Sequence, residues 1–249
     1  MNFLLKSLKK IPLWRYIVTG VLLLGLSVDA LYIYIDQNIH LSLQETLITT
    51  TSSAFNLYFV FLLMTANLGF DSLNTKEQKQ TFRSFWSQIG FVSILCLLFV
   101  LWLVICNFFA LLMKTGTVTF SNTLINTPLY ELENINASFA AILNLVLIYL
   151  YFLFITAIVL TINSCCKNKP MGYLGVLSNF ILHVIIYTFS SFPTGFFPTD
   201  YASVGSALLV TPSIPISIVI SVLYWLVLIT ATGLIYHIMN KRSKGGCLI

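Results

Sequence analysis

The sequence predicts an all-α integral membrane protein with six transmembrane helices in one domain that covers residues 1–249. Apolar residues make up 58% of the chain and charged residues only 8%, whereas soluble domains carry about 25% charged residues. The mean hydropathy is +0.91. Six apolar segments are long enough to cross a bilayer, and only short polar connectors separate them. No internal repeat or soluble domain interrupts this pattern.

The first ten residues, MNFLLKSLKK, intersperse Leu and Phe with lysines, a composition typical of an amphipathic helix that lies in the membrane interface. Pro12 ends this helix, and Trp14 and Tyr16 are aromatic residues of the kind found at the lipid headgroups. A secretory signal peptide begins in a similar way. However, the apolar run after Arg15 is too long for one, and no convincing cleavage site follows it.

Six segments are expected to span the membrane: residues 16–35, 54–70, 89–113, 139–162, 171–189 and 215–239. The second is at the short end of the roughly 17–25 residues that cross a bilayer. The connector 36–53 is polar and rich in Thr and Ser. We expect it to lie on the outer side, where a reagent would reach a cysteine placed near Gln44.

The basic residues predict the orientation. With a cytoplasmic N-terminus, 12 of the 13 Lys and Arg residues fall on the inner side and only Lys114 on the outer side. This bias predicts that both termini face the cytoplasm, and we expect the protein to lie in the plasma membrane. It also accounts for the net charge of +5 without nucleic acid, because no basic patch lies on a soluble face. The outer connectors instead hold acidic residues: Asp36, Glu45, Glu131, Glu133 and Asp200.

Residues 71–88, DSLNTKEQKQTFRSFWSQ, form the longest strongly polar run between two apolar segments. Asn74 followed by Glu77 has the spacing of a helix N-terminal capping box. Aromatic and apolar residues then recur at helical spacing and predict one apolar face: Phe82, Phe85, Trp86 and Ile89. The opposite face is basic and polar: Lys76, Lys79, Gln80 and Arg83. Such a helix suits docking by another protein, and the alternative is a charged loop that only fixes topology.

Four prolines crowd the segment between the last two spans: Pro193, Pro198, Pro212 and Pro215. The apolar stretch 202–210 within it is too short to cross, and short stretches of this kind are often re-entrant. Non-helical backbone at membrane depth is tolerated only against protein or a water-filled cavity. We therefore expect a re-entrant or outer-leaflet hairpin before the last span. The alternative is a coiled, mobile outer loop.

The chain lacks the motifs of an enzyme. It has no phosphate-binding loop, no Gly-x-Ser-x-Gly and no His-Glu-x-x-His motif. Asp29 and His183 lie within expected spans, and ionisable residues there are functional candidates by default. The simpler interpretation of His183 is a hydrogen bond to a neighbouring helix. For Asp29 it is either such a bond or a side chain that extends to the membrane interface. The five cysteines predict no disulfide framework, and we expect no cofactor or metal in this chain.

The order of these features resembles the ABC-2 type permeases, the membrane subunits of ATP-binding-cassette exporters, and particularly the small stand-alone permeases of Gram-positive bacteria. The N-terminal amphipathic helix, the six spans, the amphipathic turn after span two and the proline-rich hairpin all fit that arrangement. The resemblance covers the whole chain but is one of architecture. It implies a coupling helix that docks on a separate ATPase subunit and contains Asp71, Asn74, Lys76, Glu77, Lys79, Gln80 and Arg83.

The same resemblance implies that the hairpin closes an outer gate, through Pro193, Pro198, Tyr201 and Pro212. Two permease subunits, identical or sister chains, would then enclose a pathway within the lipid membrane, and ATP and Mg²⁺ would bind only to the ATPase partner. Possible pathway-lining residues are Phe55, Asn56, Tyr58 and Phe59, although ordinary helix packing also explains them. An apolar route suits an amphipathic peptide, a lipid or a hydrophobic drug. The alternative is an ATP-independent membrane protein: an immunity-type protein, a secondary transporter or an intramembrane enzyme.

Overall fold

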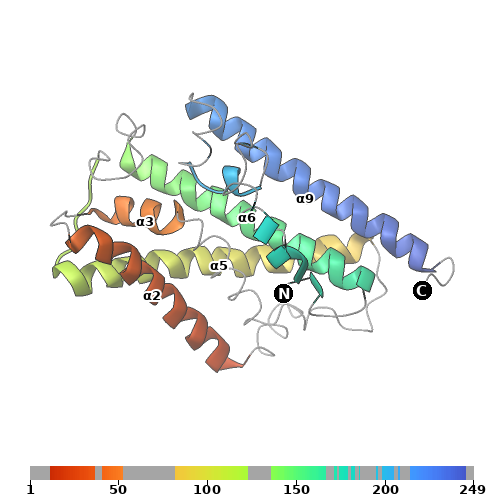
Figure 1. Ribbon diagram of the computed structural model, residues 1–249, viewed down its shortest axis with the longest axis horizontal. Coiled ribbons are helices and arrows are strands. Elements are labelled where there is room, and N and C mark those ends of the chain that lie inside the picture. Colours follow the sequence, from red (N-terminus) through yellow and green to blue (C-terminus); the bar gives the residue numbers. More distant parts are fainter. Residues whose placement is uncertain are drawn as a thin grey trace.

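The computed structural model describes residues 12–36, 41–52, 82–122, 136–166, 171–172, 174–178, 181–182, 185, 195, 198–204, 207 and 214–244. Regular structure within these ranges is helical throughout, as the sequence predicts (Figure 1). The four long helices are α2 (Leu13–Asp36), α5 (Phe82–Thr115), α6 (Ala137–Cys166) and α9 (Ile214–Lys244). Two short elements join them: the helix α3 (Leu43–Ser52) and the 3-10 helix η4 (Pro198–Tyr201).

Three of these helices are long and apolar enough to cross a membrane: Phe85–Thr115 in α5, Ala137–Ile162 in α6 and Pro215–Met239 in α9. They coincide with the third, fourth and sixth expected spans. The first expected span coincides with α2, and the described residues between 171 and 185, in the fifth, are helical. The expected second span and the N-terminal interfacial helix lie outside the described residues.

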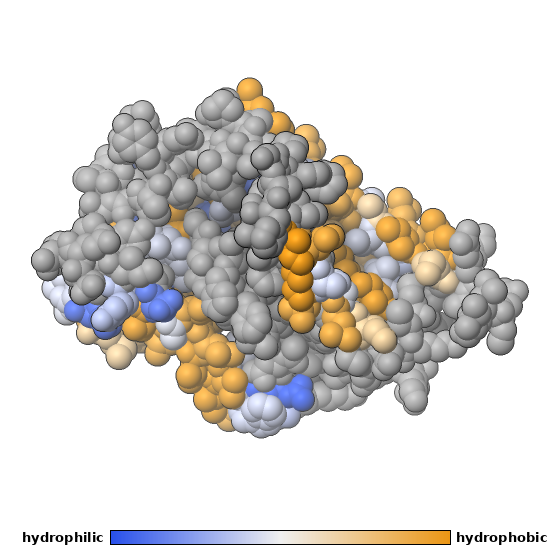
Figure 2. Space-filling model, in the orientation of Figure 1, coloured by the Kyte–Doolittle hydropathy of each residue, from blue (hydrophilic) through white to orange (hydrophobic). Residues whose placement is uncertain are grey.

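Hydrophobic side chains cover the outside of the bundle, as a lipid environment requires. Figure 2 shows them over α9 and along the middle of α2, with hydrophilic residues toward the two ends of α2. On α2 the exposed set includes Ile17 and Val21, and on α9 it includes Leu223, Val227 and Leu234. This surface supports a membrane protein independently of the count of spans.

The long helices form two parallel pairs that run in opposite directions. On α2 and α5, Gly20 lies against Trp102, and the ring of Tyr32 lies 5.4 Å from the Lys114 ammonium, so residue numbers rise together. On α6 and α9, Tyr151 contacts Trp225, and further along both helices Leu160 clusters with Tyr236. The chain must therefore return along the bundle between α2 and α5, and again between α6 and α9.

We name the two ends of the bundle after the orientation that the sequence predicts. The outer end is where α5 finishes at Thr115 and α6 begins at Ala137. The inner end is where α5 begins at Phe82 and α6 finishes at Cys166. Of the three apolar helices, α6 is the most enclosed: 67% of its most apolar stretch is buried, against 44% in α5 and 22% in α9. It is therefore the central helix against which the others pack.

Candidate functional site

The connector that the sequence placed in an exposed outer loop instead forms the buried helix α3. Gln44, at 8% exposure, is enclosed between the outer ends of α5 and α6, where its side chain bonds to Ser138 and to the Ser121 backbone. The expectation that a reagent reaches position 44 is therefore wrong. The helix packs on α2, α5 and α6 and runs from the outer end toward the middle of the bundle (Figure 1).

Local sequence explains why α3 begins where it does. Ser42 and Glu45 form a capping box, with the Glu45 carboxylate accepting from both the Ser42 backbone N–H and its hydroxyl at 2.8 Å. The Glu45 N–H donates in return to the Ser42 hydroxyl at 3.3 Å. These bonds satisfy backbone donors that a helix start leaves without partners. A second anchor comes from Leu43, whose N–H donates to the Thr119 carbonyl at 3.0 Å.

The inner half of α3 meets two buried asparagines, one on each neighbouring helix. The Thr50 hydroxyl lies 2.9 Å from Asn107 Oδ1 on α5. The Asn144 side-chain amide on α6 donates to the Thr51 hydroxyl. Asn107 and Asn144 are 0% and 1% exposed. Because buried polar groups in a membrane must find partners within the protein, these bonds fix the position of α3 between α5 and α6.

Asn144 also holds the segment before the last span. Its carbonyl oxygen Oδ1 accepts from the Val204 backbone N–H at 2.8 Å. Val204 begins a helical turn, in which the Ala207 N–H donates to the Ser203 carbonyl at 3.0 Å. An amide is suited to this position because it offers an acceptor to one element and a donor to another. Asn144 thus joins α6 to both α3 and the chain before α9.

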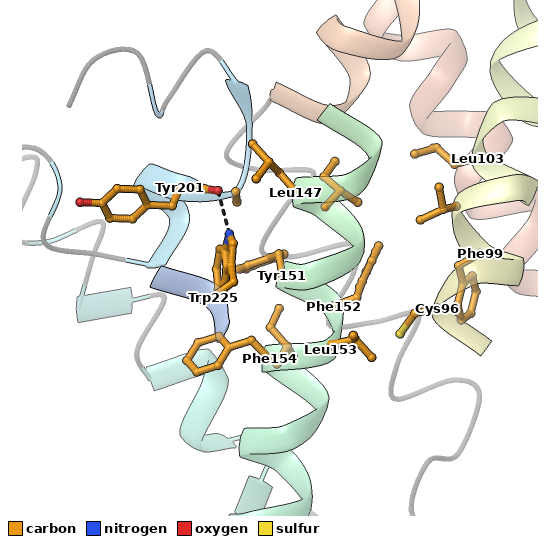
Figure 3. Close-up of a cluster of buried hydrophobic side chains, with 14 of the residues drawn as sticks. Cys96, Phe99, Leu103, Leu147, Tyr151, Phe152, Leu153, Phe154, Tyr201 and Trp225 are labelled. Atoms are coloured by element: carbon orange, nitrogen blue, oxygen red, sulfur yellow. Dashed lines mark hydrogen bonds between the residues drawn. The ribbon is translucent and has the colours of Figure 1, made fainter. Parts of the chain in front are cut away.

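We call the described residues 198–204 and 207 the outer segment. Its Tyr201 carbonyl accepts from the Trp225 indole N–H at 2.9 Å (Figure 3). The Tyr201 ring stacks on Tyr224 with centroids 4.2 Å apart. Tyr151 and Phe154 of α6 pack against the Trp225 ring. The outer segment is therefore anchored to α9 at Tyr201 and to α6 at Val204.

A short loop precedes this anchor. Gly195 has a positive φ of 96°, which favours glycine. Its N–H donates to the Asp200 carboxylate at 2.9 Å, and its carbonyl accepts from the Tyr201 hydroxyl at 3.0 Å. Burial, together with the nearby Asp200 carboxylate, raises the pKa of the Tyr201 phenol above its ordinary value of 10.0. The hydroxyl therefore keeps its proton at neutral pH and can donate this bond.

A second feature is a groove of about 380 Å³ on the side of the bundle. It lies between α2 and α5 and is almost wholly apolar. Its lining comes from both helices: Tyr16, Ile17, Thr19, Leu95, Leu98, Phe99 and Trp102. Polar atoms make up little of the lining, which suits an apolar occupant such as a lipid chain better than a polar ligand.

The residues that the sequence singled out are distributed unevenly over the structure. Tyr201 is buried and Pro198 half-buried in the outer segment, whereas Asp29 is exposed on α2. Phe85 and Ile89 are buried, and Trp86 is 38% exposed. Arg83 lies in the first turn of α5. Outside the described residues lie the other predicted site positions: 55, 56, 58, 59, 71, 74, 76, 77, 79, 80, 183, 193 and 212.

Sequence reasoning missed the polar network because its residues lie far apart in the chain. Two signals for it were present: the Ser42–Glu45 capping box, and single asparagines within the apolar runs of α5 and α6. Within the described residues, no group of three His, Cys, Asp or Glu side chains could hold a metal ion.

No protein-family model, curated protein or solved structure matches this chain.

Proposed function

We propose that this protein is the membrane-spanning subunit of an ATP-binding-cassette exporter of the ABC-2 type. Its substrate would be an amphipathic or hydrophobic molecule: a peptide, a lipid or a drug. A separate ATPase subunit would supply the energy by docking on residues 71–83, and two permease chains would enclose the route. ATP and Mg²⁺ would reside on the ATPase, and both termini of this chain would face the cytoplasm.

The observation that supports this function is the arrangement of the two parallel helix pairs with the outer segment packed between α6 and α9. Each pair requires the chain to return between its helices, which fits a second span before α5 and a fifth before α9. With α2, α5, α6 and α9 as further spans, such returns would make up the six crossings of a permease. The buried outer segment is compatible with a re-entrant hairpin before the last span.

The structure also suggests how the route would be built. The possible lining residues Phe55, Asn56, Tyr58 and Phe59 follow α3 directly in sequence. Since α3 already runs inward from the outer end, the second crossing would begin near Leu43 rather than at residue 54. The route would then have a polar outer portion and an apolar, aromatic inner portion.

The decisive experiment reverses charge on the proposed coupling helix. Lys76→Glu combined with Lys79→Glu should abolish co-purification of an ATPase in mild detergent and the substrate-stimulated ATP turnover of the complex. One exposed ion pair contributes only about 0–1 kcal/mol, so two reversals are combined to add repulsion.

A matched control makes the same charge change elsewhere on the predicted inner side. Lys167→Glu with Lys169→Glu should leave both the co-purification and the turnover near wild type. If the Lys76 and Lys79 double variant also behaves as wild type, residues 71–83 only anchor topology. If wild-type protein carries no ATPase at all, the chain works without ATP, as an immunity-type protein, a secondary transporter or an intramembrane enzyme.

A further inference from the structure

We propose that Asn144 is a positioning residue that couples α3 to the outer segment, so that the two elements open and close together at the outer end. Its importance as a gate rests on the proposed exporter function. The coupling itself rests only on contacts among described residues, and it can be tested without any transport measurement.

The coupling follows from the direction of the hydrogen bonds. The Val204 backbone N–H donates to Asn144 Oδ1, and Asn144 Nδ2 donates to the Thr51 hydroxyl. The Thr51 hydroxyl donates in turn to the Leu47 carbonyl of its own helix at 2.6 Å. One amide therefore lies between two elements that are distant in sequence. Its removal would leave a buried group without its partner on each of them.

The neighbouring asparagine provides a comparison. Asn107 also binds α3, through Thr50, but its amide N–H₂ donates to Leu103 of its own helix at 2.9 Å. Among the described residues, Asn107 hydrogen-bonds to one element beyond α5, whereas Asn144 hydrogen-bonds to two elements beyond α6. Both threonine hydroxyls also donate within α3, Thr50 to the Thr46 carbonyl and Thr51 to the Leu47 carbonyl. The comparison therefore concerns the outer segment, which loss of Asn107 should leave in place.

The anchors at the other side of the outer segment explain why it could move as a unit. Tyr201 is fixed to α9 by the Trp225 indole and by stacking on Tyr224. The bond from Val204 to Asn144 is a polar anchor to α6. If Asn144 is removed, the segment loses this anchor while it keeps those to α9, and α3 keeps the Gln44–Ser138 bond to α6 but loses the bond at Thr51.

The experiment measures the rate at which a membrane-impermeant maleimide labels single reporter cysteines. The reporters are Ser203→Cys in the outer segment and Thr46→Cys in α3, whose parent residues are 1% and 0% exposed. Each is combined with Asn144→Leu, Thr51→Val or Asn107→Leu in intact membranes. The same protein without any cysteine gives the background labelling rate. A single symmetric elution peak in detergent establishes that each variant is folded.

We expect Asn144→Leu to speed labelling at both reporters by about tenfold, the factor that corresponds to 1.4 kcal/mol. Thr51→Val should speed labelling at position 46 and leave position 203 protected, because Val204 keeps its acceptor. Asn107→Leu should change the rate at position 203 by no more than about twofold. Since Thr51→Val is a conservative change, it gives a result even if Asn144→Leu does not fold.

Two outcomes would overturn the coupling. In one, both reporter cysteines stay slow to label in Asn144→Leu, which would mean that the amide contributes packing but does not hold the two elements. In the other, Thr51→Val exposes position 203 as much as position 46, so that the segment depends on α3 directly. In the complex with its ATPase, Asn144→Leu should also raise ATP turnover without substrate while the ATPase remains bound. Absence of a bound ATPase would contradict the exporter function and leave the labelling result intact.

Discussion

The two ends of the bundle are stabilised in different ways. At the outer end, polar groups on α3, α5, α6 and the outer segment bond to one another, and Asn144 is shared between elements. At the inner end, Phe85, Ile89, Ala157, Leu160 and Tyr236 form an apolar cluster. There two buried polar atoms, Gln88 Oε1 and the Tyr236 hydroxyl, have no hydrogen-bond partner among the described residues; at the outer end the same holds for Thr49 Oγ1 on α3. Hydrogen bonds between polar side chains thus fix the positions of the helices at the outer end. At the inner end, close packing of apolar side chains does so.

This difference predicts that a substitution of a polar by an apolar side chain lowers the unfolding free energy at Asn144, at the outer end, and raises it at Tyr236, at the inner end. The largest effect should come from Asn144→Leu, which leaves the Val204 N–H and the Thr51 hydroxyl without their shared partner. The Thr51 hydroxyl keeps the Leu47 carbonyl as a partner, so the main cost is the buried Val204 N–H, and we expect a loss of about 1–3 kcal/mol in unfolding free energy. Denaturant titration in detergent micelles measures it. Equal stabilities of Asn144→Leu and Asn107→Leu would contradict the special role of the shared amide.

The second prediction tests packing at the inner end. A Cβ on Gly233 would lie 2.9 Å from Phe85 Cε1, and the Phe85 ring is fully buried. Gly233→Val should therefore lower the unfolding free energy by about 1–3 kcal/mol through overpacking. Gly90→Ala is the control, because nothing lies within 4 Å of its added Cβ, and it should gain up to about 1 kcal/mol in helix propensity. Similar thermal shifts for both variants would show that inner packing is loose.

The third prediction is a gain in unfolding free energy, where the first was a loss. Tyr236→Phe removes a buried hydroxyl that has no hydrogen-bond partner in the described part of the chain, and it retains the ring, whose centroid is 4.8 Å from that of Phe85. We expect the unfolding free energy to rise by up to about 1 kcal/mol, and Gln88→Met to behave alike. The readout is the denaturant midpoint in the same micelles. A clear loss of stability in Tyr236→Phe would mean that the hydroxyl is hydrogen-bonded in the membrane.

The smallest expected effect concerns pH at the outer segment. Because the pKa of Tyr201 is raised in the folded protein, its contribution is fully present below pH 10 and is lost as pH rises through the folded value. Relative to Tyr201→Phe, the wild type should be more stable by up to about 1 kcal/mol at pH 8. That difference should shrink above pH 10. A difference that stays constant from pH 8 to 11 would contradict donation from the phenol to Gly195.

Much of the fold could be predicted from hydropathy, because a long apolar run has few alternatives to a helix in a membrane. The expected spans 89–113, 139–162 and 215–239 match the apolar helices of the structure within a few residues. The first span likewise coincides with α2. Orientation relative to the membrane stays a prediction from the basic residues.

Helix α3 could not be found in this way, and its hydroxyls explain why. Hydropathy treats each Thr as a group that needs water. In α3, however, the hydroxyls of Thr46, Thr50 and Thr51 donate to the carbonyls of Ser42, Thr46 and Leu47 in the preceding turn. These hydroxyls are therefore hydrogen-bonded within the helix segment itself and do not need water as a partner. The remaining partners, Asn107 and Asn144, lie 57 and 93 positions away, a distance that no local pattern reveals.

That separation has a consequence for how the protein is made. When residues 43–52 leave the ribosome, α2 has been made, but the α5 and α6 side chains that will bond to α3 have not yet been synthesised. Thr51 must wait for Asn144, and Asn144 must wait another 60 residues for Val204. The contacts that join α3 to α5, α6 and the outer segment can therefore form only after Val204 has been made. A chain truncated before Val204 should lack the bond that joins the outer segment to α6.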